Sequence, residues 1–253
     1  GVSDLLNVTG NVTVDDGAFL NVIGFAGYDG QDFGSFSVIS ATGTLASSAG
    51  FTIIDDFNFA VSPTYTSVPD GLTLDVASVF NFWLGGNGSW LDSFNWSLGV
   101  APTSSHDVFL NDIIAITVTL AGGIGEGTNN LTSSSLVTLN LTSSSLTISG
   151  KADVFGPLNL DSSTLNINGD ANFNVLSMTN ASEIDGTGTG TVSIVNGVLL
   201  SNSRVSNVTD FSADTYTIQG LSRFSNSLIN HDGTLEITAA GDRLELQNTQ
   251  MDS

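Results

Sequence analysis

The sequence contains no cysteine and very few basic residues. Among its 253 residues only 4 are Lys or Arg, whereas 25 are Asp or Glu, and the formal net charge at pH 7 is −21. Without cysteine the chain forms neither disulfide bonds nor thiolate sites. With so few cations it cannot neutralise a phosphate backbone, so nucleic acid is excluded as a partner. An anionic membrane surface would repel the chain for the same reason.

Long apolar runs and strong helix formers are also scarce. No stretch approaches the roughly 18 apolar residues of a membrane-spanning helix, so membrane insertion is not expected. Lys, Arg, Gln, Met and Glu are rare, whereas Ser, Thr, Asn, Val and Gly are abundant. What the chain has instead is alternation: "SLTIS", "TVSIV" and "TLEIT" place apolar residues at every second position. This period predicts an all-β protein.

A longer period of about 20 residues is superimposed on the alternation. The segments "SSLTISGKADVF" (144–155) and "STLNINGDANFN" (163–174) match each other, and the same local phrase carries an apolar residue six times along the chain. These residues are Leu146, Leu165, Ile184, Val205, Phe224 and Leu244. A right-handed parallel β-helix explains the pattern, because stacked coils of about 20 residues would align these side chains in one interior column.

One phrase is written twice in succession: residues 130–149 read "NLTSSSLVTLNLTSSSLTIS". In a β-helix we expect Leu and Ile to face inward and Ser and Thr to face outward. Such strands pair with almost any neighbour, so the phrase can be copied and stacked on its own copy. Chance duplication within a Ser/Thr-rich tract is the alternative. Asp-Gly dipeptides such as Asp185-Gly186 are expected at the corners between faces.

Three of the four basic residues share one phase of the repeat. Arg204, Arg223 and Arg243 each precede a column residue, and Glu183 has the same phase one coil earlier. We therefore predict an outward ladder in which Glu183 can pair with Arg204. Exposed ion pairs contribute about 0–1 kcal/mol each, which favours a surface feature. A stripe that contacts anions or sugar acids is the alternative.

One segment breaks the pattern and holds all three tryptophans: "FNFWLGGNGSWLDSFNWSLGVAPTSSHDVFLND", residues 80–112. It resembles a phrase of bacterial autotransporter-like and haemagglutinin-like surface proteins, W-x-G-G-x-G-x-W, then N-W-S, then Pro and Asp. The matching positions are Trp83, Gly85, Gly86, Gly88, Trp90, Asn95, Trp96, Ser97, Pro102 and Asp107. The resemblance covers about thirty residues and implies a style of secreted repeat protein rather than an activity.

These patterns suggest three regions. We expect residues 1–80 to form the β-helical or β-rich end of a repeat unit, residues 81–112 a Trp- and Gly-rich boundary module, and residues 113–253 the coils of the parallel β-helix. The resemblance further implies that the chain is one circularly shifted period of a tandem array, cut from a longer protein. The full gene would decide this hypothesis.

Two kinds of binding site can be considered. Trp83, Trp90 and Trp96 can cover an apolar flank of the β-helix, which is the favoured interpretation, or form a sugar-binding platform. Asp29, Asp32, Asp55 and Asp56 lie in Asp-rich turns that suit calcium better than zinc, although solvated corners are the simpler interpretation. No cofactor is otherwise expected.

Enzymatic signals are weak. Polysaccharide-degrading β-helices need carboxylates close to Lys or Arg, but here most of the few basic residues are assigned to a surface ladder. Neither His106 nor His231 has the context of a catalytic triad. We therefore expect a non-enzymatic extracellular protein of a bacterial cell surface, a segment of a stalk, adhesin or fibre. Its expected partners are neighbouring copies end to end, or surface glycans. A carbohydrate-binding or polysaccharide-degrading β-helix is the alternative.

Overall fold

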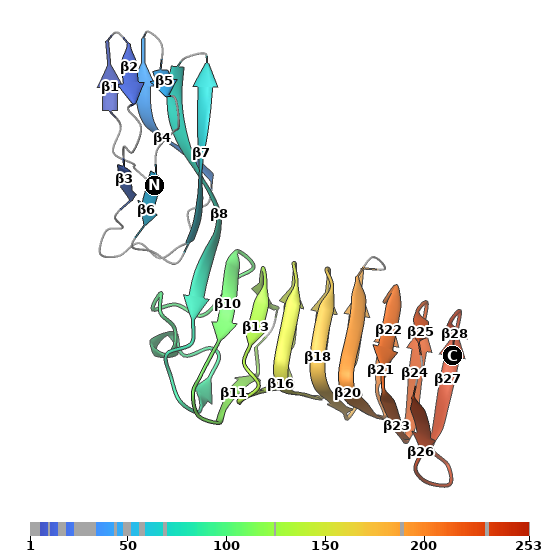
Figure 1. Ribbon diagram of the computed structural model, residues 1–253. Helices are drawn as coiled ribbons and strands as arrows, with labels where there is room; N and C mark the ends of the chain where they lie inside the picture. Colours follow the sequence, from blue (N-terminus) through green and yellow to red (C-terminus); the bar gives the residue numbers. More distant parts are fainter. Residues whose placement is uncertain are drawn as a thin grey trace. The chain divides into compact units, whose positions relative to one another are not determined.

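The structure of the chain is a computed structural model (Figure 1). It describes residues 6–9, 11–14, 19–22, 34–42, 45–47, 52–55, 59–67, 70–123, 125–187, 190–230 and 233–252. Within these ranges the regular structure is β-strand, apart from one 3₁₀ turn, η1 (Ser93–Asn95). No helix in the described ranges is long and apolar enough to cross a membrane. The chain divides into two compact units, 1–80 and 81–253.

The first unit contains two stacked coils of three strands each. The strands are β1 (Leu6–Val8), β2 (Val12–Val14) and β3 (Phe19–Val22) in one coil, and β4 (Gly34–Ala41), β5 (Leu45–Ser47) and β6 (Thr52–Asp55) in the next. Each strand pairs in parallel with its counterpart, as Leu6 does with Ile39. Two further strands, β7 (Phe59–Ser67) and β8 (Asp70–Phe82), pair with each other in antiparallel fashion, and β8 also pairs with β4. The sequence pattern did not predict this antiparallel pairing.

The second unit is a parallel β-helix, which confirms the predicted all-β fold and its coils of about 20 residues. Each coil bends through three faces, named A, B and C here in chain order. The strands stack from coil to coil along one axis (Figure 1). The right-handed sense of the coil stays a prediction. The unit begins at residue 81, where the second predicted region begins, and residues 81–112 belong to the same unit as the coils.

The strands of faces A and B belong to one continuous sheet, because several strands bend from one face onto the other. Face A contains β10 (His106–Leu110), β13 (Leu131–Ser133), the first parts of β16 (Ala152–Asp161), β18 (Ala171–Thr179) and β20 (Thr191–Ser201), then β22 (Asp210–Ala213), β25 (Leu228–Asn230) and β28 (Gln250–Asp252). Face B contains β9 (Gly88–Ser89), β11 (Ile116–Ala121), β14 (Val137–Thr142), the second parts of β16, β18 and β20, then β23 (Thr215–Gln219) and β26 (Thr234–Ile237).

Face C is a separate seven-stranded sheet. Its strands are β12 (Glu126–Thr128), β15 (Ser145–Ile148), β17 (Thr164–Ile167), β19 (Glu183–Gly186), β21 (Arg204–Ser206), β24 (Leu221–Ser225) and β27 (Arg243–Gln247). Every pairing within this sheet is parallel. One strand per coil therefore lies on face C, and the apolar column predicted from the sequence runs along its inner side.

The structure places five of the six predicted column residues opposite one another. Leu146, Leu165, Ile184, Val205 and Phe224 are consecutive partners on face C and are fully buried. Leu244 is the exception, because Leu246 lies opposite Phe224 and Leu244 lies opposite Ser222. The preceding turn (Thr238–Asp242) makes this coil two residues longer than the predicted spacing. Leu244 still packs against the core, but from the adjacent position.

A column of buried serines runs beside the apolar column, and it corrects the expectation that serines face outward. Each serine lies two residues before a column residue: Ser144, Ser163, Ser182, Ser203 and Ser222. The backbone amides of Ser144, Ser163 and Ser203 donate to the Oγ of the serine in the next coil, at 3.2–3.4 Å. The hydroxyls replace bonds that these buried amides would otherwise lack. The signal was present in the sequence, since the inward phase repeats every second residue.

Asparagines, rather than the expected Asp-Gly pairs, occupy one corner. Asn207, Asn226 and Asn248 adopt left-handed conformations with φ of 55°, 51° and 50°, which Asn tolerates better than most residues. Each donates its side-chain amide to the previous coil: Asn248 to Asn226, Asn226 to Asn207, and Asn207 to Asp185. Asp185-Gly186 itself lies at the end of β19.

The duplicated phrase also has a different explanation from the one expected. Leu131 lies in β13 on face A, and Leu141 lies in β14 on face B of the same coil. Their partners in the next coil are Ala152 and Leu160. The two copies of the phrase therefore follow each other around one coil and do not stack on each other.

Candidate functional site

The tryptophan segment closes the first end of the β-helix. Its backbone continues the ladders of faces A and B, because Trp83 N donates to Phe109 O at 2.9 Å and Trp90 N donates to Thr119 O at 2.8 Å. The strand β9 pairs in parallel with β11. After β9 the chain passes through the 3₁₀ turn η1. The Asp92 carboxylate caps this turn by accepting a hydrogen bond from Phe94 N at 3.1 Å. The segment is thus a partial coil with a loop folded over the core.

The three indoles pack edge to face. The ring centroids of Trp83 and Trp96 are 5.0 Å apart at an interplanar angle of 84°, and those of Trp90 and Trp96 are 4.9 Å apart at 71°. Trp96 Nε1 donates to Trp90 O at 2.6 Å, and Trp83 Nε1 donates to Gly86 O at 3.1 Å. Such aromatic pairs contribute about 0.5–1.5 kcal/mol beyond their burial.

The burial of these indoles argues against a sugar platform built from them. Trp83, Trp90 and Trp96 are 4%, 0% and 2% exposed, so no indole face is available for stacking with a sugar ring. The favoured interpretation of the sequence, in which they cover an apolar flank, agrees with their place in the core. Phe94 is the exposed aromatic side chain of this loop.

The glycines of the segment make room for Asn95. A Cβ at Gly85 would lie 2.6 Å from Asn95 Oδ1, and a Cβ at Gly88 would lie 2.7 Å from Asn95 Nδ2. Asn95 Nδ2 in turn donates to Ser89 O at 3.0 Å. A Cβ at Gly86, in contrast, would meet nothing within 4 Å. Two of the three motif glycines therefore serve the packing of one asparagine.

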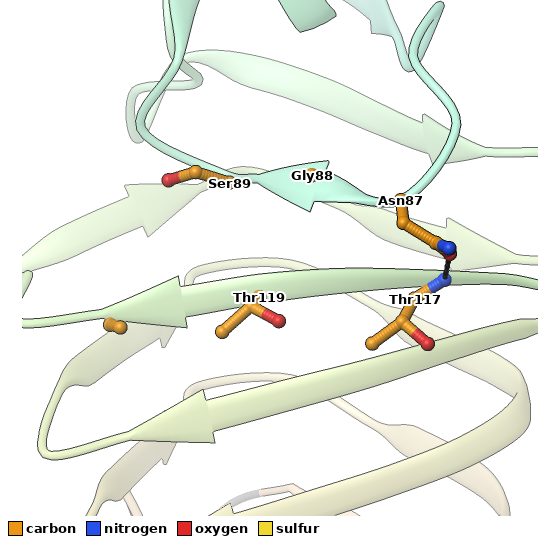
Figure 2. Close-up of a pocket in the computed structure, with 6 residues that line it drawn as sticks. Asn87, Gly88, Ser89, Thr117 and Thr119 are labelled. Atoms are coloured by element: carbon orange, nitrogen blue, oxygen red, sulfur yellow. Dashed lines mark hydrogen bonds between the residues drawn. The ribbon is translucent and has the colours of Figure 1, made fainter.

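A shallow depression lies on the outer side of face B where the cap meets the first full coil (Figure 2). It is lined by Asn87, Gly88, Ser89, Thr117, Thr119 and Ala121. Figure 2 shows Asn87 reaching from the cap to β11, where its Oδ1 accepts from Thr117 N at 2.7 Å. The lining is neutral, although the protein carries a net charge of −21. The sequence did not predict this depression, because it joins residues about thirty positions apart.

Neutral polar side chains continue down face B from the depression. Thr138 and Asn140 of β14 lie opposite Thr117 and Thr119 of β11. One coil further, Asn159 Nδ2 donates to Asn140 Oδ1 at 2.8 Å. Hydroxyl and amide groups on the outer side of a sheet can form hydrogen bonds with sugar hydroxyls, and they need no charge on the ligand.

All four basic side chains form ion pairs on the wall of the helix. The predicted pair exists, with Arg204 Nε 3.3 Å from Glu183 Oε1. Arg223 continues that column, and its Nη2 lies 2.7 Å from Glu245 Oε2. Arg243 lies outside that column, because its partner in the previous coil is Leu221. Its Nη2 lies 3.5 Å from Oε1 of Glu245 in the same strand. On face A, Lys151 Nζ lies 2.8 Å from Asp153 Oδ2.

The histidine in "SHD" has a structural place. His106 is buried at the start of β10, and its Nδ1 accepts from Thr103 N at 3.0 Å. Its neighbour Asp107 accepts from the side-chain amides of Asn129 and Asn130 of the next coil, both at 2.8 Å. These contacts fix the first corner of the β-helix.

The metal candidates fall largely outside the described residues. This holds for Asp29, Asp32 and Asp56, and for Asp55 the structure describes only the backbone, at the end of β6. Among the described side chains, no group of three His, Cys, Asp or Glu residues could hold a metal ion. Calcium binding by the Asp-rich turns stays a prediction.

No family model, curated protein or solved structure matches this chain.

Proposed function

We propose that the chain is a non-enzymatic structural and adhesive segment of a long extracellular stalk or fibre on a bacterial surface. The observation that carries the proposal is the coil-to-coil ladder of like side chains. Buried serines, corner asparagines and the face-C ion pairs Arg204–Glu183 and Arg223–Glu245 bond to the neighbouring coil, in addition to the parallel backbone ladders. A solenoid stabilised in this way gains length by adding coils, and each coil depends on its neighbours.

Stretching the chain between its ends tests the stalk role. Parallel coils should unravel one after another under force, because each coil contacts only its neighbours. Every step should lengthen the chain by roughly 70 Å, the extended length of about 20 residues. Single-molecule force spectroscopy would measure these steps. Unfolding of residues 81–253 in a single low-force event would contradict the stalk role.

The adhesive part of the proposal is supported by the neutral depression on face B. Its hydroxyl and amide groups favour a neutral glycan, since acidic glycans are repelled by the net charge of −21. The double variant Thr117→Val, Thr119→Val should abolish binding to a panel of neutral polysaccharides, while the fold persists because Val is a strong strand former. Thr132→Val on face A is the matched control. Release of reducing or unsaturated ends from any polysaccharide would instead support the enzymatic alternative.

A further inference from the structure

Among the described residues, the last coil of the β-helix exposes apolar side chains on all three faces. Ile237 on face B, Leu246 on face C and Met251 on face A are 50%, 46% and 36% exposed. Their partners one coil earlier, Ile218, Phe224 and Ile229, are almost fully buried. These three exposed residues therefore occupy interior columns of the solenoid, and no described coil lies above them.

The strand edges at this end are equally open. Among the described strands, β26, β27 and β28 each pair on one side only, with β23, β24 and β25. Their outer edges present backbone donors and acceptors beside apolar side chains. A flat protein surface or a helix satisfies only the apolar part. Another three-stranded parallel coil satisfies both.

The first coil of the same chain has the matching features. Its strands β1, β2 and β3 also pair on one side only within the described residues, in parallel with β4, β5 and β6. Leu6 is 57% exposed, although its partner Ile39 in the next coil is buried. Val8 is likewise more exposed than its partner Ala41. The first coil thus has an open side that carries apolar column residues.

We propose that the coil β1–β3 of a second copy stacks on the coil β26–β28, with its strands parallel to them. The copies can be joined in one polypeptide or meet as separate chains. This inference rests on the proposed stalk role and names its contact surfaces. Because the two surfaces differ, the contact repeats head to tail and produces filaments. Each copy carries a charge of −21, so salt should strengthen the contact by screening repulsion.

Two blocked variants test the head-to-tail geometry. Leu6→Asp should block the first coil and Leu246→Asp the last coil, and each variant alone should stay monomeric. An equimolar mixture should form dimers and nothing larger, because a mixed pair uses the one intact end of each variant. The unaltered chain should form a concentration-dependent series of oligomers in high salt. Light scattering after size-exclusion chromatography would measure all of these species.

Matched controls separate this contact from general stickiness and from misfolding. Val195→Asp removes an exposed apolar side chain from the wall of β20 and should leave the oligomer series unchanged. Since the chain has no cysteine, Leu6→Cys can be mixed with Ile237→Cys, Leu246→Cys or Met251→Cys, and one mixture should cross-link. The cross-linked mixture identifies the face on which β1 lies.

Three results would overturn the inference: an unaltered chain that is monomeric at every concentration and salt, a blocked variant that still polymerises, or the absence of cross-linking in all three mixtures. None of them bears on stepwise unravelling under force, which tests the stalk role itself. A stalk that unravels coil by coil but never associates would retain the proposed function and lose this contact.

Discussion

The two ends of the β-helix differ in how its interior columns finish. At the first end, three indoles fold over the core and are almost inaccessible to solvent. At the last end, the columns stop at Ile237, Leu246 and Met251, which stay exposed. Phe224 and Leu246 occupy the same column on adjacent coils, yet one is buried and the other is not. Burial in this fold therefore depends on the coil above and not on the strand's own sequence.

The largest expected effect comes from truncating the cap. Trp96→Ala removes a ring that contacts both other indoles and leaves a cavity, which should cost about 3–5 kcal/mol of unfolding free energy. Leu246→Ala at the open end should cost less than about 1 kcal/mol, because its side chain has little to lose. Denaturant unfolding followed by tryptophan fluorescence would compare them.

The exposed aromatic of the same loop supplies the control. Phe94 is 92% exposed, so Phe94→Ala should leave the unfolding midpoint almost unchanged. Equal losses for Trp96→Ala and Leu246→Ala would show that the last coil is covered in solution. That result would remove the difference between the two ends for the isolated chain and would favour the head-to-tail contact.

Much of the fold was predictable because the period of the coils is written in the sequence. Leu146 to Phe224 were located by phase alone, since four successive coils differ little in length. Leu244 was misplaced because the turn before β27 adds two residues, and a turn's length is not visible in the periodicity of its flanking strands. The first unit was harder for the same reason, because its coils place Leu6 and Ile39 opposite each other across a much longer stretch.

The candidate site was less predictable, since it depends on which residues meet across coils. The tryptophans were noticed, but whether an indole faces a sugar or the core is decided by packing that a single sequence does not display. Asn87 and Thr117 meet only because β9 lies beside β11. The serine column could have been found, since Ser182 lies two residues before Ile184 and therefore has the same inward phase.

A matched pair of hydroxyls, on Ser227 and Thr249, gives a smaller test of the difference between a covered coil and the open last coil. Ser227 and Thr249 occupy the same corner one coil apart, directly before β25 and β28. Ser227 Oγ is buried, accepts from Val208 N at 3.2 Å and donates to Ser225 O at 3.0 Å. Thr249 Oγ1 donates to Gln247 O at 3.0 Å in an exposed setting.

Ser227→Ala should cost about 1–3 kcal/mol, because the buried Val208 amide loses its acceptor. Thr249→Ala should cost within about 0.5 kcal/mol, because water replaces the lost bond. Thermal unfolding by circular dichroism would rank the two variants. An equal cost for both variants would mean that water is excluded from the corner at Thr249 as fully as from the corner at Ser227, contrary to the exposure of Thr249.

The smallest expected effect is a response to acid that differs between the middle and the open end. Backbone bonds from Gly220 and, less strongly, the Thr238 hydroxyl and the Ala239 amide hold the pKa of Asp242 below its ordinary value. The backbone amide and then the hydroxyl of Thr191 lower the pKa of Asp170 in the same way. Both carboxylates therefore stabilise the fold above the ordinary aspartate value of 3.8, and this stabilisation is lost as pH falls through the lower folded pKa.

The two carboxylates should nevertheless differ in what their protonation releases. β20 is paired with β18 on one side and with β22 and β23 on the other, so its interior amides should stay protected from hydrogen exchange when Asp170 is protonated or replaced by Asn, and only the Thr191 amide should lose its acceptor. Asp242 anchors a turn of the last coil, so acid or Asp242→Asn should expose the Gly220 and Ala239 amides. Both variants remove one negative charge, so the change in net charge repulsion is the same for each and does not affect their comparison. Loss of protection in the interior of β20 and in the last coil at the same pH would show that the coils open together and that the open end has no weaker coil.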